Sequence, residues 1–408
     1  MDLAHPLLTL DPLARDIQAE GRRLRALGPM VPVELPQGVP AWAATDHETV
    51  SSVLHHPDLL KNPKNWRAYT EGKIPPTWPL LGMVVAETML NYDGMDHMRV
   101  RSLVQAAFTR ARIEALRPRI EDIVAGLLDQ LAGTEPGTST DLRSRFASRL
   151  PMEVICELFG LDDAAARDRL ASDMDALLDS RTSGERILAA LEGVQNVTSD
   201  LLMRKREEPG EDLTTALIAA RDEDEDRLSE KELGDTLFLM LLAGHETTQN
   251  LITNAVKNLL QHPDQLSLVR EKTVGWSAVV EETLRRDGPV NCVLFRYAAK
   301  DLELAGRLIR TGEPVLVSLA TTGRDPDAVP DPDAFLLDRP DGSRRHLAFG
   351  HGPHFCLGAP LARLEAEVAL EALFARFPEL YCPVDLDSLE PVPSLSTNCV
   401  RELPVVLT

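Results

Sequence analysis

The sequence lacks the features of several large protein classes. Its five cysteines are odd in number and scattered, and no two form a Cys-x-x-Cys pair, which argues against a disulfide framework and favours a reducing compartment. Acidic residues outnumber basic ones, 64 against 43, and the net charge of −21 disfavours a general nucleic-acid binder. The most apolar run, LFLMLLAG at residues 237–244, is too short to cross a bilayer, and the N-terminus resembles no signal peptide. We therefore predict a cytoplasmic protein with no membrane span and no nucleic-acid partner.

The apolar residues that are present indicate a large, mostly helical core. Of 408 residues, 44% are hydrophobic. Apolar residues at three- and four-residue spacing predict helices at 148–161, 183–208 and 366–377. Alternating segments predict a hairpin from 28–36 and 40–46, and two or three strands within 301–320. Because no linker or repeat interrupts the chain, we predict one mainly α domain with small β-sheets over residues 1–408.

One predicted helix is unusually long and has an irregular middle. Ser229 and Glu232 form a Ser-x-x-Glu capping box at its start, and no proline follows until Pro263. Such a helix would run roughly 45 Å, and its apolar faces predict a central, buried position. The segment AGHETT at 243–248 then places glycine, a carboxylate and two threonines in this interior, where each disfavours a regular buried helix. The residues alone leave two alternatives open, a tolerated kink or a local opening beside a ligand.

The cysteine at position 356 lies in a segment with an unusual composition, LAFGHGPHFCLGAPLARLE at 347–365. Pro360 suits the first turn of a helix, so the thiol would lie near a helix N-terminus, which favours the thiolate. A buried structural cysteine is one alternative. A zinc site of His351, His354 and Cys356 is another, although the His-x-x-His-x-Cys spacing suits no common closed site. A thiolate presented by a glycine-rich loop to a flat metal cofactor indicates heme.

The segment FGHGPHFCLGAPLARLE resembles the heme-binding signature of the cytochrome P450 superfamily. The positions that define this signature are held by Phe349, Gly352, His354, Cys356 and Gly358. Three further motifs of the family occur in the expected order: DHMRVR with His97 and Arg101, AGHETT, and EETLRR with Glu282 and Arg285. The likeness covers about residues 40 to 405 and is greatest to soluble actinobacterial members. It implies the cytochrome P450 fold, a single domain whose long central helix crosses over the heme.

The resemblance also implies roles for individual residues. Cys356 would be the axial ligand of heme b, with Phe349 packed on the thiolate side of the ring and Gly358 beside it. The cations expected at the heme propionates are His97, Arg101, Arg296 and His354. Glu246 and Thr247 would deliver protons while O2 is activated, and Ala243 and Gly244 would leave space above the iron. No catalytic role is predicted for His245.

Glu282 and Arg285 are expected to form a buried structural network with a third, basic partner. Many relatives carry arginine where this chain has Ala334, so we predict that Arg339 takes its place. A second departure is Gly323, where many relatives carry asparagine.

The pocket residues predict a medium to large apolar substrate. Its steroid or macrolide type is implied by resemblance alone, since WPLLGMV at 78–84 and DGMDHMRVR at 93–101 resemble soluble actinobacterial members that act on such compounds. The proline-broken, aromatic segment at 61–94 is typical of a loop that covers a binding site, with plain surface packing as its alternative. The residues predicted to line the substrate pocket are Met83, Val84, Met240, Asn291 and Cys292, together with Ala243.

Electrons are expected to come from NAD(P)H through a ferredoxin reductase and a ferredoxin, because no flavin or iron–sulfur segment is evident. A basic patch for this acidic donor would consist of Arg110, Arg112, Arg344, Arg345 and Arg363. The chain is thus predicted to be a monooxygenase. The alternatives are a non-catalytic heme-thiolate ligand binder or sensor, which would have no use for the Glu246–Thr247 pair, and a zinc-dependent interaction module.

Overall fold

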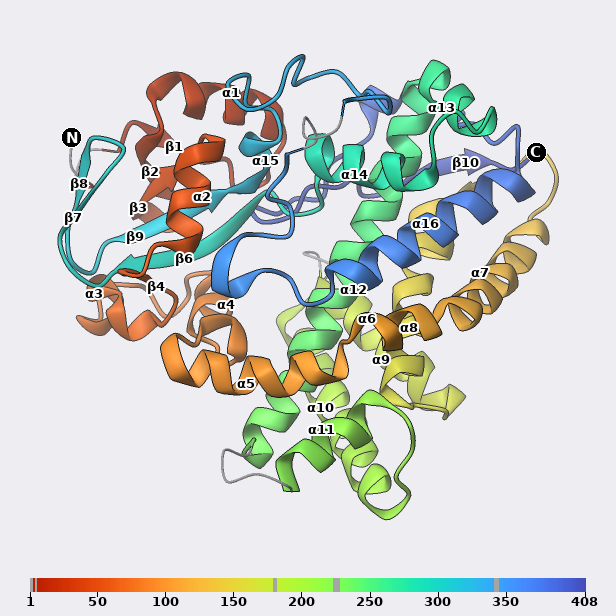
Figure 1. Ribbon diagram of the computed structural model, residues 1–408, viewed down its shortest axis with the longest axis horizontal. Coiled ribbons are helices and arrows are strands. Elements are labelled where there is room, and N and C mark those ends of the chain that lie inside the picture. The colour runs from red at the N-terminus through yellow and green to blue at the C-terminus, as the bar shows by residue number, and fades with distance from the viewer. Residues whose placement is uncertain (1–2, 4–5, 179–181, 223–227, 341–344) are drawn as a thin grey trace. The chain divides into compact units, whose positions relative to one another are not determined.

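The computed structural model describes residues 3, 6–178, 182–222, 228–340 and 345–408, and these fold into two compact units (Figure 1). The first unit consists of Met1–Asp93, Asn254–Cys356 and Leu386–Arg401, and the second of Gly94–Thr253, Leu357–Asp385 and Glu402–Thr408. The mainly α architecture with small sheets is as predicted. The organisation as a single domain stays a prediction.

The first unit is built on a six-stranded sheet with the order β1-β2-β3-β9-β6-β4. The strands are β1 (Leu8–Thr9), β2 (Met30–Leu35), β3 (Val39–Ala44), β4 (Leu59–Leu60), β6 (Cys292–Ala298) and β9 (Pro314–Ser318). The pairs β1–β2 and β3–β9 are parallel, and the other neighbours are antiparallel. A separate two-stranded sheet pairs β7 (Leu302–Leu304) with β8 (Arg307–Ile309). The predicted N-terminal hairpin and the strands within 301–320 are therefore confirmed.

The large sheet is apolar on both faces. Along β9, Leu316 belongs to one hydrophobic cluster, while Val315 and Val317 belong to the other, as the two-residue period of a strand requires. The first cluster also holds Trp66 and Trp78 from the segment that follows β4.

The first unit also contains several short helices. They are α1 (Ile17–Leu27), α2 (His47–His55), α3 (Arg67–Thr70), α4 (Leu81–Val85), α13 (Pro263–Arg270), α14 (Trp276–Asp287) and α15 (Leu319–Thr322). The carboxylate of Asp46 caps α2 by accepting the amide of Thr49 at 2.7 Å. Helix α2 packs against β9 and also against the 3₁₀ turn Gly352–His354, so it links the sheet to the cysteine loop.

The second unit is almost entirely helical. Its helices are α5 (Gly94–Ala107), α6 (Arg110–Ala115), α7 (Arg117–Ala132), α8 (Arg149–Phe159), α9 (Ala164–Leu178), α10 (Gly184–Glu207), α11 (Leu213–Asp222) and α16 (Ala359–Arg376). Strands β5 (Ser139–Asp141) and β10 (Pro404–Val406) form an antiparallel pair. Helix α16 lies along α7 (Figure 1). Helices α8, α10 and α16 confirm the three helices predicted from apolar spacing.

The long helix, α12, runs from Glu230 to Gln261. At about 1.5 Å per residue its 32 residues extend roughly 48 Å. The predicted capping box is confirmed, since the amide of Glu232 donates to Ser229 Oγ at 3.1 Å and the amide of Ser229 donates to Glu232 Oε2 at 2.8 Å. In the parts of the chain that the structure describes, no helix combines the length and hydrophobicity that crossing a membrane requires.

Candidate active site

The loop that precedes Cys356 is fixed by backbone hydrogen bonds and by two glycines. The amide of Cys356 donates to the carbonyl of Phe349 at 2.9 Å, and the amide of Gly350 donates to that of Leu347 at 2.7 Å. Gly350 and Gly352 both have φ of +73°, a region that favours glycine. A Cβ on Gly352 would lie 2.9 Å from the Cβ of His55 on α2, so the loop approaches α2 more closely than another residue would allow.

Cys356 differs from the other thiols in its exposure. None of the five cysteines, all of which the structure describes, forms a disulfide, and Cys356 is exposed, whereas Cys156, Cys292 and Cys399 are buried. Burial raises the pKa of Cys156 and of Cys292 to about 12, so these two thiols stay protonated. Cys356 lies three residues before the start of α16, where backbone amides favour a thiolate. Cys356 is thus the most exposed of the five thiols, with Cys382 half-exposed, and its role as a metal ligand stays a prediction.

The zinc alternative has no ligand set in the described part of the chain, where no three His, Cys, Asp or Glu side chains are grouped to hold a metal ion. The ring of His351 instead packs edge-on against the ring of His55, with 5.3 Å between the centroids.

The basic residues predicted at the heme propionates are distributed over both units. Arg296 on β6 and His354 in the 3₁₀ turn belong to the first unit, and His97 and Arg101, one turn apart on α5, belong to the second. Arg296 is only 3% exposed, and burial lowers its pKa to about 10, although the negative charge of Asp93 opposes the shift. Among the described residues nothing hydrogen-bonds or ion-pairs with its guanidinium. A buried guanidinium with no such partner is suited to bind an acidic group such as a propionate.

The acid and the alcohol of α12 lie in the second unit. The hydroxyl of Thr247 donates to the carbonyl of Ala243 at 2.7 Å, the interaction with the preceding turn that a helical threonine makes. Glu246 is half-buried. A Cβ on Gly244 would lie 3.1 Å from Ile155 Cδ1 on α8, so this glycine allows α12 to approach α8. The heme contacts of Ala243 and Gly244 stay predictions.

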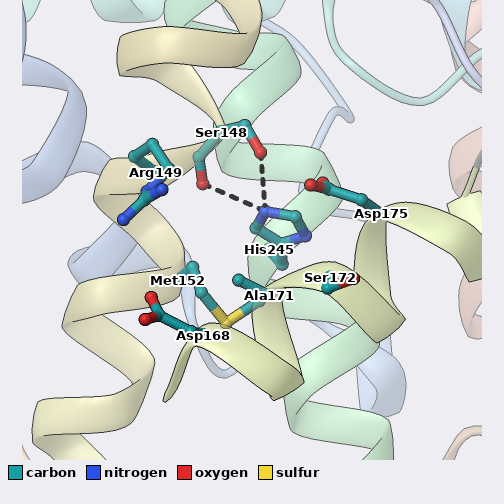
Figure 2. A pocket seen from close by; sticks show the side chains of 8 residues that line it. All are labelled: Ser148, Arg149, Met152, Asp168, Ala171, Ser172, Asp175 and His245. Carbon is teal, nitrogen blue, oxygen red and sulfur yellow. Dashed lines mark hydrogen bonds between the residues drawn. The ribbon is translucent and has the colours of Figure 1, made fainter. Parts of the chain in front are cut away.

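His245 points away from this turn toward α8 and α9, into a pocket of about 260 Å³ (Figure 2). Its Nε2 lies 3.0 Å from the carbonyl of Ser148 and 3.1 Å from Ser148 Oγ. Nδ1 faces Asp175 (Figure 2) and has no hydrogen-bond partner among the described residues. Burial lowers the pKa of His245, with Asp175 opposing the shift. His245 is therefore a buried residue that joins α12 to Ser148, and its lack of a catalytic role stays a prediction.

Glu282, Arg285 and Arg339 form one buried ionic network in the first unit. Arg285 donates to Glu282 through Nε at 2.8 Å and through a terminal nitrogen at 2.7 Å. The Nε of Arg339 donates to Glu282 Oε1 at 2.9 Å. The side chains of Glu282 and Arg285 are 0% exposed and that of Arg339 is 3% exposed. The predicted third partner is thus confirmed.

The remaining donors of the network bind backbone carbonyls and fix the segment that leads to the cysteine loop. Arg339 donates to the carbonyls of Pro330, Asp331 and Ala334, and Arg285 donates to Ala334, Pro332 and Gly323. A Cβ on Gly323 would lie 1.6 Å from the carbonyl oxygen of Arg285, which explains why glycine occupies this position. The network therefore joins α14 to Gly323 and to the segment 330–339.

The residues predicted to line a substrate pocket lie in different environments. Val84 and Cys292 are buried in the hydrophobic cluster that contains Trp66 and Trp78, whereas Met83 is 48% exposed. The side-chain amide of Asn291 and the thiol of Cys292 both donate to the carbonyl of Leu395, at 2.9 and 3.2 Å. Met240 is half-buried on α12 in the second unit. Contact of all five with substrate stays a prediction.

The structure describes only some of the arginines in the predicted basic patch. Arg112 on α6 is exposed and Arg363 on α16 is half-buried, and these two helices pack together within the second unit. Arg345 is exposed in the first unit. Arg344 lies outside the described residues, as does the side chain of Arg110.

Sequence reasoning missed two buried ionisable residues. Lys61, directly after β4, is 2% exposed, and Glu365 on α16 is also 2% exposed. Lys61 follows two leucines, but its burial beside Arg296 depends on the pairing of β4 with β6, which no local pattern indicates. Glu365 is one of several acidic residues on its helix, and no local pattern separates it from the exposed ones.

Known proteins resemble this chain over nearly its whole length. The sequence profile of the cytochrome P450 family matches residues 185–273 and 276–397. 2-Hydroxy-5-methyl-1-naphthoate 7-hydroxylase from Streptomyces carzinostaticus is 42% identical, and the match covers 98% of this chain and 97% of that protein. 6-Deoxyerythronolide B hydroxylase from Saccharopolyspora erythraea is 40% identical over 94% of each chain.

A solved structure extends the likeness to the fold. CYP154C4 from Streptomyces sp. ATCC 11861, bound to testosterone, superimposes with a TM-score of 0.92 at 40% identity, covering 98% of both chains. The exposed thiol at a helix start, the buried Glu282–Arg285–Arg339 network and these relatives lead to one conclusion. This chain belongs to the cytochrome P450 family and is a heme-dependent monooxygenase.

Proposed function

We propose that this monooxygenase inserts one atom of O2 into a C–H bond of a medium to large apolar substrate of the steroid or macrolide type. Its electrons come from NAD(P)H through a ferredoxin reductase and a ferredoxin. The observation that carries the proposal is the exposed thiol of Cys356, presented by a glycine loop directly before α16.

The cofactor in this proposal is heme b, and the residues present fit it. Cys356 supplies the thiolate ligand, and Phe349, whose carbonyl accepts the amide of Cys356, lies beside that ligand in the same loop. Arg296, His354, His97 and Arg101 supply cations or donors for the propionates. Bound heme contributes the redox chemistry that activates O2, and the thiolate makes it suited to O–O cleavage.

Glu246 and Thr247 manage protons in this proposal. The hydroxyl proton of Thr247 is directed at the carbonyl of Ala243, so the lone pairs of Oγ1 are available to accept a hydrogen bond from a water molecule. The half-buried carboxylate of Glu246, at the position before Thr247, takes up protons and releases them toward that water. A ligand sensor would need neither group, which favours the enzyme.

The substrate class draws support from the relatives. One carries the name of a naphthoate hydroxylase, another that of a 6-deoxyerythronolide B hydroxylase, and a third was solved with testosterone. All three names refer to largely apolar ring compounds. Five cysteines without a disulfide also fit the proposed cytoplasmic location.

The test is a screen of steroids and macrolides against the purified heme protein. A substrate should change the spin state of the heme spectrum and should also raise NAD(P)H consumption when surrogate ferredoxin and reductase are supplied. A spectral change with no turnover from any ligand would favour the sensor.

A further inference from the structure

Two cations of the first unit face each other across the edge of the sheet. Strand β4 pairs with β6 so that Leu59 lies opposite Ala298 and Leu60 lies opposite Tyr297. Continuing this antiparallel register by one residue brings Lys61 opposite Arg296. Directly opposed residues share one face of a sheet, and like charges in that position repel each other.

Both side chains are buried, which makes their repulsion stronger. Lys61 is 2% exposed and Arg296 is 3% exposed. Burial lowers the pKa of Lys61 well below its ordinary value, and the neighbouring charge of Arg296 lowers it further, against the attraction of Asp93. Water therefore solvates neither cation well, and a compensating anion is needed.

The protein itself places little negative charge near these two cations. The carboxylate oxygens of Asp93 accept the backbone amides of Lys61 and Asn62, at 2.8 and 2.7 Å. The ammonium group of Lys61 donates to the carbonyl of Leu294 at 2.9 Å, a neutral acceptor that uses one of its three protons. Within the described residues neither cation forms an ion pair. The site is thus a pair of cations with one partly engaged carboxylate.

We propose that Lys61 binds a heme propionate together with Arg296, so that one carboxylate of the cofactor is held by two cations, one on β6 and the other directly after β4. This inference rests on the proposed binding of heme. A single carboxylate between the two would turn their repulsion into two charge-assisted hydrogen bonds. The bond to Leu294 positions the ammonium group without neutralising it.

The experiment is a thermodynamic cycle on the full-length protein. The dissociation rate of heme is measured by transfer to apomyoglobin, and the same is done for heme dimethyl ester, which has no propionate charge. For the wild type, esterification should speed dissociation. The esterification penalty is the ratio of the dissociation rate of the ester to that of heme. In Lys61→Met this ratio should fall by about tenfold, the loss expected when a hydrogen bond between charged groups disappears.

Matched variants separate charge from packing. Lys64→Met removes an exposed lysine from the same segment and should leave the esterification penalty unchanged. Lys61→Arg keeps the charge and should keep most of the penalty. Lys61→Gln keeps a donor for the carbonyl of Leu294 but loses the charge, so it should behave like Lys61→Met and replaces that variant if it does not fold.

A purely structural role for Lys61 predicts a different pattern. Both hemes would then dissociate faster from Lys61→Met and Lys61→Gln by the same factor, with the esterification penalty unchanged, and the proposal would be wrong. A wild-type protein that binds neither heme would instead contradict the proposed function, so the two failures are distinct.

Discussion

Arg339 Nε lies 2.9 Å from Oε1 of Glu282, a hydrogen bond that joins residues 57 positions apart in the sequence. The same carboxylate holds Arg285 one helical turn away, so a single negative charge serves two buried guanidinium groups. Their remaining donors bind carbonyls of the segment from Pro330 to Ala334. The network therefore couples α14 to the part of the chain that leads into the cysteine loop.

We expect Glu282→Gln to be strongly destabilising, because it leaves two buried cations without an anion. Breaking a buried ion pair by removing one partner typically costs about 3–5 kcal/mol. Denaturant unfolding followed by circular dichroism measures the loss, and Glu271→Gln, at an exposed position after α13, is the matched control. A free energy of unfolding within about 0.5 kcal/mol of the wild type, the usual effect of a surface change, would mean that the network does not hold the fold.

Patterns that are local in sequence predicted much of this structure. The capping box of Ser229 and Glu232 joins residues three positions apart, and the N-terminal hairpin joins adjacent segments. Arg339 was predicted because a motif with two of its three members present specifies a basic third.

Features that depend on distant pairing were not predictable. Lys61 lies beside Arg296 only because β4 pairs with β6, which is more than 200 residues later in the chain. Gly323 must be glycine because the carbonyl of Arg285 occupies the space of a side chain. The hydrogen bond from the thiol of Cys292 to the carbonyl of Leu395 likewise joins residues 103 positions apart.

Replacing Thr247 by valine should uncouple electron use from product formation. The shape of the side chain is kept, but the lone pairs that accept a water molecule are lost, so peroxide should form at the expense of product. Thr253→Val on the same helix removes an equivalent bond to the preceding turn, that of Thr253 to the carbonyl of Gln249 at 2.8 Å, and should leave coupling intact. The fraction of electrons that reach product is obtained by measuring NAD(P)H consumption, peroxide and product in the same reaction. Equal coupling in the two variants would show that protons arrive by another route.

Glu365 should make the protein less stable as pH rises. Burial raises the pKa of this carboxyl from 4.5 to about 8, so the folded state holds a proton that the unfolded state has lost in this range. The contribution of Glu365 to the free energy of unfolding is therefore complete below about pH 4.5. It decreases between pH 4.5 and about pH 8, by at most about 1.4 kcal/mol per pH unit. Glu365→Gln should flatten this part of the curve of unfolding free energy against pH, whereas Glu371→Gln, exposed on the same helix, should not. Identical pH profiles for wild type and Glu365→Gln would refute the assignment.

The arginines on α6 and α16 should contribute to docking of the ferredoxin. Charge reversal by Arg112→Glu together with Arg363→Glu should slow reduction of the heme by ferredoxin and weaken the dependence of that rate on salt, since electrostatic steering acts mainly on association. Stopped-flow reduction at several ionic strengths measures both effects. Arg23→Glu, an exposed arginine of the first unit, provides the comparison. If all variants show the same salt dependence, the donor docks elsewhere.

The central claim is that the thiolate of Cys356 binds the heme iron, and the spectrum of the reduced protein with carbon monoxide tests it most directly. The wild type should show the long-wavelength Soret band of a thiolate-bound heme. Cys356→Ser should lose this band while the far-ultraviolet circular dichroism stays that of the wild type, and Cys382→Ser, a half-exposed thiol in the second unit, should keep it. A Cys356→Ser protein that retains the band would contradict the account, because another residue would then hold the iron.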